Sequence, residues 1–134
     1  NRFHLPKWRI LLEAIVEEDR MMLPNRIQTS SKAMGKLRYM KQATGLTPNI
    51  LSRFAIMKAI EGGGSIKNAG VVDNDGQVLS RDVLFGDHAE VYSAILSQYV
   101  HENKIKDPLQ DVIVALIEIG VHKMGHIKKI QDLI

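Results

Sequence analysis

The side chains of this chain best suited to binding a ligand are the Lys and Arg residues of one segment that contains no Asp or Glu. Between Met22 and Ile60 the sequence holds seven Lys and Arg residues and no Asp or Glu. They are Arg26, Lys32, Lys36, Arg38, Lys41, Arg53 and Lys58. An unscreened positive field can develop there, and such a field attracts polyanions such as DNA. The alternative is a solvated face whose charge is balanced after folding by the middle of the chain, where residues 61–108 hold eight acids and four bases.

Two further positions have side chains suited to nucleic acid. Arg26 and Gln28 flank Ile27 in a short segment that alternates between polar and apolar residues. If Ile27 points inward, both polar side chains lie on the other face of a strand, and Arg and Gln can read guanine and adenine edges. Thr47 precedes Pro48 at the expected start of a helix, where the positive helix end favours a phosphate. The alternative for Thr47 is a helix cap and nothing more.

No other motif supports a metal, nucleotide or catalytic site. Asp73-Asn74-Asp75-Gly76 lacks the first acid and the terminal glutamate of a calcium loop, so it is predicted to be a turn. His122 and His126 can share a helix face, but Lys123 stands where a zinc protease has glutamate. Gly62-Gly63-Gly64 belongs to no Gly-Lys-Ser/Thr motif, which favours a linker. We therefore expect no enzyme activity, no metal and no cofactor, and without cysteine the chain has no thiol chemistry.

The elements that must position the bases are mainly helices. Apolar spacing and capping residues predict helices over 6–20, from Ser30 or Ser31 to about Thr44, and from Thr47-Pro48 to Glu61. Further helices are predicted from a capping box at Asp87 and Glu90, over 109–119, and to the chain end with interruptions at Gly120 and Gly125. The helix over 48–61 is apolar nearly all round, which predicts burial between neighbours or subunits.

The β-structure is expected to be small. The order strand, helix, turn, helix over 25–61 matches ribbon-helix-helix modules, in which an antiparallel two-stranded ribbon enters a DNA groove. Val71-Val72 and Gln77-Val78-Leu79 can pair as a small β-hairpin around the turn at 73–76. The fold class is therefore mainly α, a compact helical domain with a ribbon-helix-helix-like N-terminal half.

Length and composition favour one domain that spans the chain, 1–134, with 1–21 as an additional N-terminal helix. Hydrophobic residues make up 45%, enough for a core. The longest apolar stretch, 112–121, contains Glu118 and is shorter than the roughly 20 residues that a membrane-spanning helix needs. With no secretion-type leader and no cysteine, the expected location is the cytoplasm, without membrane contact.

Two blocks of sequence resemble the DndE family of DNA sulphur modification proteins. They are MLPNRIQTS at 22–30 and TGLTPNILSRFA at 44–55, and their separation agrees as well. A weaker likeness continues through Leu84-Phe85-Gly86 and His122 to Ile127. The N-terminal helix lies outside the resemblance, and Ser52 stands where cysteine is common in the family, so this member has no thiol role there.

The resemblance implies a non-catalytic DNA-binding subunit of the bacterial system that replaces a non-bridging backbone oxygen with sulphur. It implies a homotetramer that binds duplex DNA, including nicked DNA, beside a cysteine desulfurase, a sulphur-transferring ATP pyrophosphatase and an ATPase. Two alternatives stay open, a DNA nickase and a protein-interaction scaffold of the same system. Carried over to this sequence, the expected phosphate contacts are Arg26, Lys32, Lys36, Arg38 and Lys41. Arg53 and Lys58 are added to these contacts, although their helix is expected to be buried.

Overall fold

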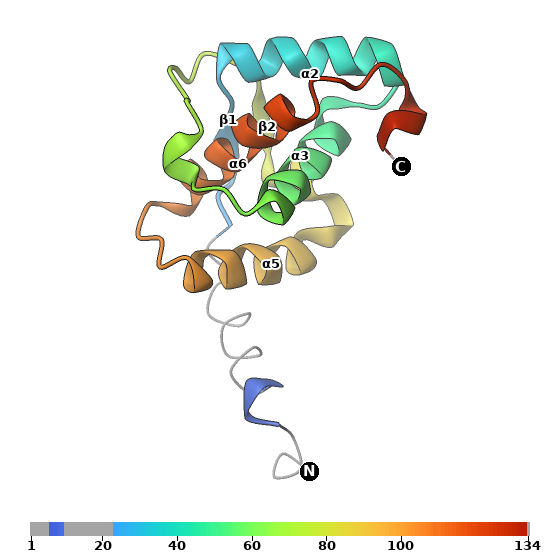
Figure 1. Cartoon of the computed structure of the whole chain (residues 1–134). Coiled ribbons are helices and arrows are strands. Elements are labelled where there is room, and N and C mark those ends of the chain that lie inside the picture. The colour runs from blue at the N-terminus through green and yellow to red at the C-terminus, as the bar shows by residue number, and fades with distance from the viewer. Residues whose placement is uncertain (1–5, 10–22, 134) are drawn as a thin grey trace.

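The computed structural model of the chain describes residues 6–9 and 23–133. Helices α2 and α5 lie on opposite sides of a layer formed by α3, α6 and two short strands (Figure 1). The elements are β1 (Arg26–Gln28), α2 (Ser31–Thr44), α3 (Pro48–Gly62), η3 (Ile66–Asn68), β2 (Val78–Ser80), α4 (Arg81–Phe85), η4 (Gly86–His88), α5 (Ala89–Glu102), α6 (Leu109–Lys123) and η5 (Ile130–Leu133). The prediction of a mainly helical fold with a little antiparallel β-structure is confirmed.

The N-terminal helix predicted over 6–20 falls largely on residues that the structure does not describe. Within the described part, residues 7–9 are helical. Among the described helices, none has both the length and the apolar character needed to cross a bilayer.

Helices α2 and α3 form where the local signals predict them. The Ser30 hydroxyl caps α2 by accepting a hydrogen bond from the Ala33 amide at 3.0 Å. Gly45 ends α2 in the left-handed conformation, with φ of 78°, which glycine adopts without steric cost. Thr47 occupies the N-cap of α3 and Pro48 its first turn, but the Thr47 hydroxyl makes no capping hydrogen bond. The chain therefore leaves α2 at Gly45, and a new helix begins at Pro48.

Helix α6 is the centre of the core and packs most extensively against α3. Leu116 and Ile117 of α6 and Leu51 of α3 are fully buried, and burying a side chain of this size contributes about 1.5–3 kcal/mol. At Gly120 the two helices touch, because a Cβ there would overlap the backbone carbonyl of Ala55. The predicted helix interruption at Gly120 is therefore wrong: this glycine permits close helix packing, and α6 continues through it to Lys123.

The two strands form one antiparallel sheet in which Ile27 lies opposite Leu79. Both side chains are buried in the core. The prediction of a strand near Arg26 is confirmed, whereas the pairing of Val71-Val72 with 77–79 is wrong, because β2 pairs with β1. The sheet therefore joins the start of the described fold to its middle.

The turn at 73–76 anchors the start of α2, which explains why no local hairpin forms. The Asp73 carboxylate accepts hydrogen bonds from the Ser31 amide at 2.8 Å and from the Ser31 hydroxyl at 2.7 Å. The Gly76 amide donates to the Thr29 carbonyl at 2.8 Å. The pKa of Asp73 lies below its usual value because the Asp75 amide, the Ser31 amide and the Ser31 hydroxyl all donate to its carboxylate and stabilise the ionised form.

Helix α5 begins without the capping box that the sequence predicts. Its N-cap is His88, which makes no side-chain capping bond, and Asp87 lies within η4. Asp87 lies inside η4, which leads directly into α5, so it does not stand at the N-cap of that helix.

Candidate nucleic-acid interface

Four of the predicted phosphate contacts lie on α2, on two flanks of the helix. The buried face of α2 is formed by Ala33, Leu37 and Met40. With about 100° of rotation per residue, Lys32 and Lys36 fall on one side of this face. By the same rotation Arg38 and Lys41 fall on the other side. Each flank thus carries two bases, and α2 itself contains no acid.

The flank with Lys32 and Lys36 faces the end of α6. Lys36 Nζ lies 2.6 Å from His122 Nδ1. An ammonium group can only donate a hydrogen bond, so His122 Nδ1 accepts and the imidazole proton resides on Nε2. Burial lowers the pKa of His122, the charges of Lys36 and Lys32 lower it further, and Glu118 opposes them. Lys32, Lys36 and His122 are called the basic cluster below.

The carboxylate that acts on the basic cluster faces the interior. Glu118 is 1% exposed and lies one helical turn before His122 on α6. Its Oε1 accepts a hydrogen bond of 2.7 Å from the Ser30 hydroxyl, and its Oε2 has no partner among the described residues. Because Ser30 is also the cap of α2, Glu118 joins the end of α6 to the start of α2. Glu118 therefore positions the two helices that carry the cluster.

The strand β1 presents Arg26 to solvent, while Gln28 is half-buried. Ile27 is fully buried, as the alternation predicted. The Gln28 amide donates to the Gly76 carbonyl at 3.3 Å, so it also holds the turn at 73–76. Arg26 and Gln28 line a cavity of about 420 Å³ together with residues of β2 and α6. Both strands of this ribbon belong to the same chain, since β1 pairs with β2.

The two bases of α3 contact groups outside the basic cluster. Arg53 is half-buried and lies near Gly86 and Tyr92, where burial raises the pKa of Tyr92 and the Arg53 charge opposes this rise. Lys58 lies 4.0 Å from Glu61 in an ion pair one turn along the helix. The structure therefore does not join Arg53 or Lys58 to the cluster on α2.

The outer side of α3 carries a stripe of apolar side chains. Ile50, Phe54 and Met57 follow one another at spacings of four and three residues, and Phe54 and Met57 are 38% and 39% exposed. We call these three residues the apolar stripe. On the opposite side of α3, Leu51, Ala55, Ile56 and Ala59 are buried as predicted. The stripe is therefore an apolar face of this helix that the described residues leave partly open.

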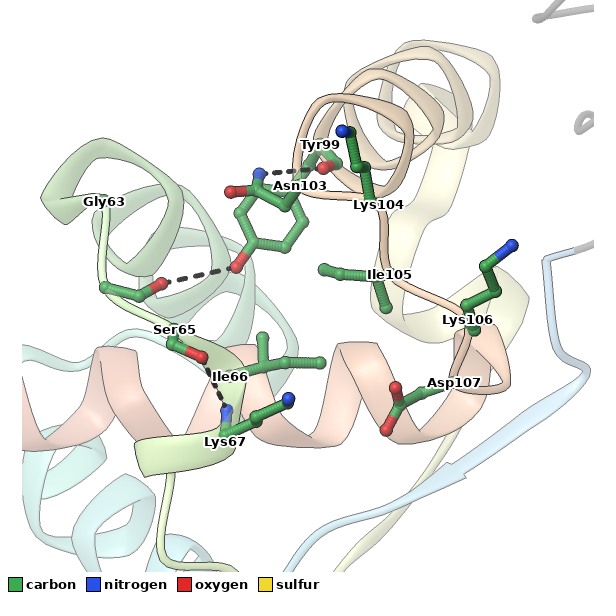
Figure 2. Close-up of a pocket in the computed structure, with 11 residues that line it drawn as sticks. Gly63, Ser65, Ile66, Lys67, Tyr99, Asn103, Lys104, Ile105, Lys106 and Asp107 are labelled. Atoms are coloured by element: carbon green, nitrogen blue, oxygen red, sulfur yellow. Dashed lines mark hydrogen bonds between the residues drawn. The ribbon is translucent and has the colours of Figure 1, made fainter.

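A cavity of about 480 Å³ lies between the glycine linker and the end of α5. The Tyr99 hydroxyl donates to the Gly64 carbonyl at 3.5 Å and ties the linker to α5. Lys67, Lys104 and Lys106 line the cavity, but Figure 2 shows their ammonium groups pointing in different directions. The three ammonium groups therefore do not converge on one point.

Sequence reasoning missed His122 as a member of the basic cluster, to which its neighbour Lys123 does not belong. His122 lies 86 positions from Lys36, and no local pattern connects them. The Lys123 side chain lies against Gly62 at the end of α3. The one available signal is that His122 lies in the last turn of a long apolar helix, and this turn must reach the surface.

Comparisons with known proteins identify the family of this chain and proteins with a similar fold. A family model described as DNA sulphur modification protein DndE matches residues 26–132. The crystal structure of DndE from Escherichia coli B7A, involved in DNA phosphorothioation modification, is similar with 25% identity and a TM-score of 0.65. That match covers 77% of this chain and 98% of the other.

A second similar structure agrees in fold. It is a crystal structure of a DndE mutant with lysines in place of two glycines, involved in DNA phosphorothioation. Its identity is 24% and its TM-score 0.62, and the match covers 77% of this chain and 99% of the other. No curated protein sequence matches the chain.

Proposed function

The chain belongs to the DndE family of DNA sulphur modification proteins, and from this premise we propose that it is a DNA-binding subunit of a bacterial DNA phosphorothioation system. In this proposal it is non-catalytic, acts in the cytoplasm, and contacts the backbone of duplex or nicked DNA. The sulphur transfer itself is the work of other DNA sulphur modification proteins, which are its partners.

The observation that carries the proposal is the distribution of charge around α2. The helix has bases on both flanks and no acid of its own, and its solvent side includes Gly35, which has no side chain to block a close approach. Phosphate groups bind Lys and Arg without regard to sequence, and this contact supplies most of the affinity of non-specific DNA binding. Arg26 on β1 adds a further base in the same acid-free stretch.

We also propose that the chain acts as a homo-oligomer, a tetramer in line with its family resemblance. The apolar stripe on α3 supports this proposal, because exposed apolar side chains that share one helix face are suited to contact with a second copy. Phe54→Glu should therefore reduce the mass measured by light scattering, while Val72→Glu, at a side chain that is 80% exposed in a loop, should leave it unchanged. A wild-type monomer would contradict the proposal.

The test of DNA binding is a salt titration with intact, nicked and single-stranded DNA. If four bases neutralise phosphates, log affinity falls with log salt with a slope of about −3.6, from roughly −0.9 per phosphate. Binding that does not respond to salt would contradict a backbone contact. Relaxation of supercoiled plasmid in the presence of Mg²⁺ or Mn²⁺ would contradict the non-catalytic role and favour a nickase.

A further inference from the structure

The basic cluster brings together two side chains that repel each other when both are charged. Lys36 Nζ and His122 Nδ1 are 2.6 Å apart, and Lys32 lies one turn before Lys36 on the same flank of α2. A lysine ammonium at neutral pH leaves His122 neutral, with Nδ1 as the acceptor. The free protein therefore holds two positive charges and one uncharged imidazole at this point.

A bound anion would reverse the preference of His122 for its neutral form. The charged groups that act on His122 are Lys36 and Lys32 from α2 and Glu118 from its own helix. Glu118 already bonds to the Ser30 hydroxyl and is buried, so it does not neutralise the lysines at the surface. A phosphate placed between the lysines would accept the Lys36 hydrogen bond and release His122 Nδ1 to take up a proton.

We propose that Lys32, Lys36 and His122 form one phosphate-binding site, at which a backbone phosphate of DNA takes the Lys36 ammonium from His122, and His122 gains a proton from solvent. This inference rests on the proposed function, since it assigns the phosphate to DNA. It adds to that function a named contact outside the acid-free stretch and a coupling between DNA binding and pH.

The coupling has a definite sign. Because burial and the two lysines hold the pKa of free His122 below its ordinary value, the free protein favours the neutral imidazole at pH 7. The bound phosphate favours the imidazolium, so binding consumes a proton between the free and the bound pKa, and affinity rises as the pH falls through this window. One proton per site allows at most a tenfold change in affinity per pH unit. We expect a gain of about three- to tenfold from about pH 7.5 to about pH 6.

The experiment measures the affinity of a short duplex at these two pH values at constant ionic strength. Wild type is compared with His122→Gln, which retains an amide hydrogen-bond donor but cannot titrate. His101→Gln, at an exposed histidine on α5, is the matched control. We expect His122→Gln to lose most of the pH dependence and His101→Gln to keep it. Circular dichroism and thermal unfolding establish that both variants fold.

Imidazole NMR provides the second measurement and depends less on the variants. The His122 resonance is assigned by its loss in His122→Gln, and its pKa is measured with and without the duplex. A rise in this pKa on DNA binding supports the proposal. An unchanged pKa, or equal pH dependence in wild type and His122→Gln, overturns the site but leaves the proposed function intact. A failure of wild type to bind duplex DNA even at low salt overturns the proposed function together with this inference.

Discussion

The packing of α6 against α3 places His122 beside α2, and one substitution tests it directly. Gly120→Ala adds a single methyl group at the helix contact. A Cβ at this position would overlap the carbonyl oxygen and the Cα of Ala55. Since the neighbour is backbone, no side chain can rotate away, and the helices must separate to make room. Both Gly120 and Ala55 are buried, so the separation would open the core around them.

The size of the effect is the difference between two opposing contributions. Alanine is better than glycine in a helix by about 1 kcal/mol. Overpacking a core costs typically 1–3 kcal/mol and occasionally more, and the upper end applies where backbone is the obstacle. The net loss in the free energy of unfolding is therefore about 2 kcal/mol, or a fall in Tm of roughly 6–10 °C for a chain of this length.

The assay is thermal and urea unfolding of wild type, Gly120→Ala and a matched control, Gly35→Ala. Gly35 lies within α2, and a Cβ there would meet nothing within 4 Å. The control should be more stable than wild type by up to about 1 kcal/mol, because it gains helix propensity without a clash. If Gly120→Ala proves as stable as the control, the close contact between α3 and α6 is refuted.

The remaining predictions concern single polar groups. Ser30→Ala should lower the free energy of unfolding in urea by roughly 2–3 kcal/mol, because it removes the α2 cap and leaves the buried Glu118 without its donor. Asp73→Asn should flatten acid unfolding: the lowered pKa makes the stabilising contribution of Asp73 present above its ordinary pKa of 3.8 and lost as pH falls through the lowered value. His122→Gln should flatten the dependence of Tm on pH near 6, since the lowered pKa of His122 makes wild type lose stability as pH falls below 6.5.

Each of these has a clear contrary result. A loss of less than about 0.5 kcal/mol in Ser30→Ala would show that its two hydrogen bonds contribute little. Acid unfolding of Asp73→Asn that follows wild type would mean that the turn at 73–76 does not depend on the carboxylate. An unchanged Tm profile in His122→Gln would place the imidazole away from the lysines of α2.

The parts of the fold that the sequence predicts well are those with local signals. Helices α2 and α3 are bounded by the Ser30 cap, Gly45 and Pro48, all of which act within a few residues. The partner of β2 could not be predicted in this way, because Leu79 pairs with Ile27, which is far from it in the sequence. The predicted interruption at Gly120 is wrong for the same reason. The low helix propensity of glycine is a local property, whereas the contact that requires glycine here comes from another helix.

The candidate site shows the same division. The bases of α2 follow from composition, and helical periodicity separates Lys32 and Lys36 from Arg38 and Lys41 once the buried face is known. The approach of His122 to Lys36 depends on how α6 packs, which no spacing in the sequence encodes. The assignment of all these bases to DNA stays a prediction that binding measurements must test.

The most direct measurement compares the salt dependence of duplex binding in wild type with that in the double variant Lys32→Gln/Lys36→Gln. If the basic cluster contacts the backbone, the slope of log affinity against log salt should become shallower by about 1.8, or roughly 0.9 for each lost contact. Lys106→Gln, at an exposed lysine that lines the cavity between the glycine linker and the end of α5, is the control and should keep the wild-type slope. Equal slopes in wild type and the double variant would contradict the account.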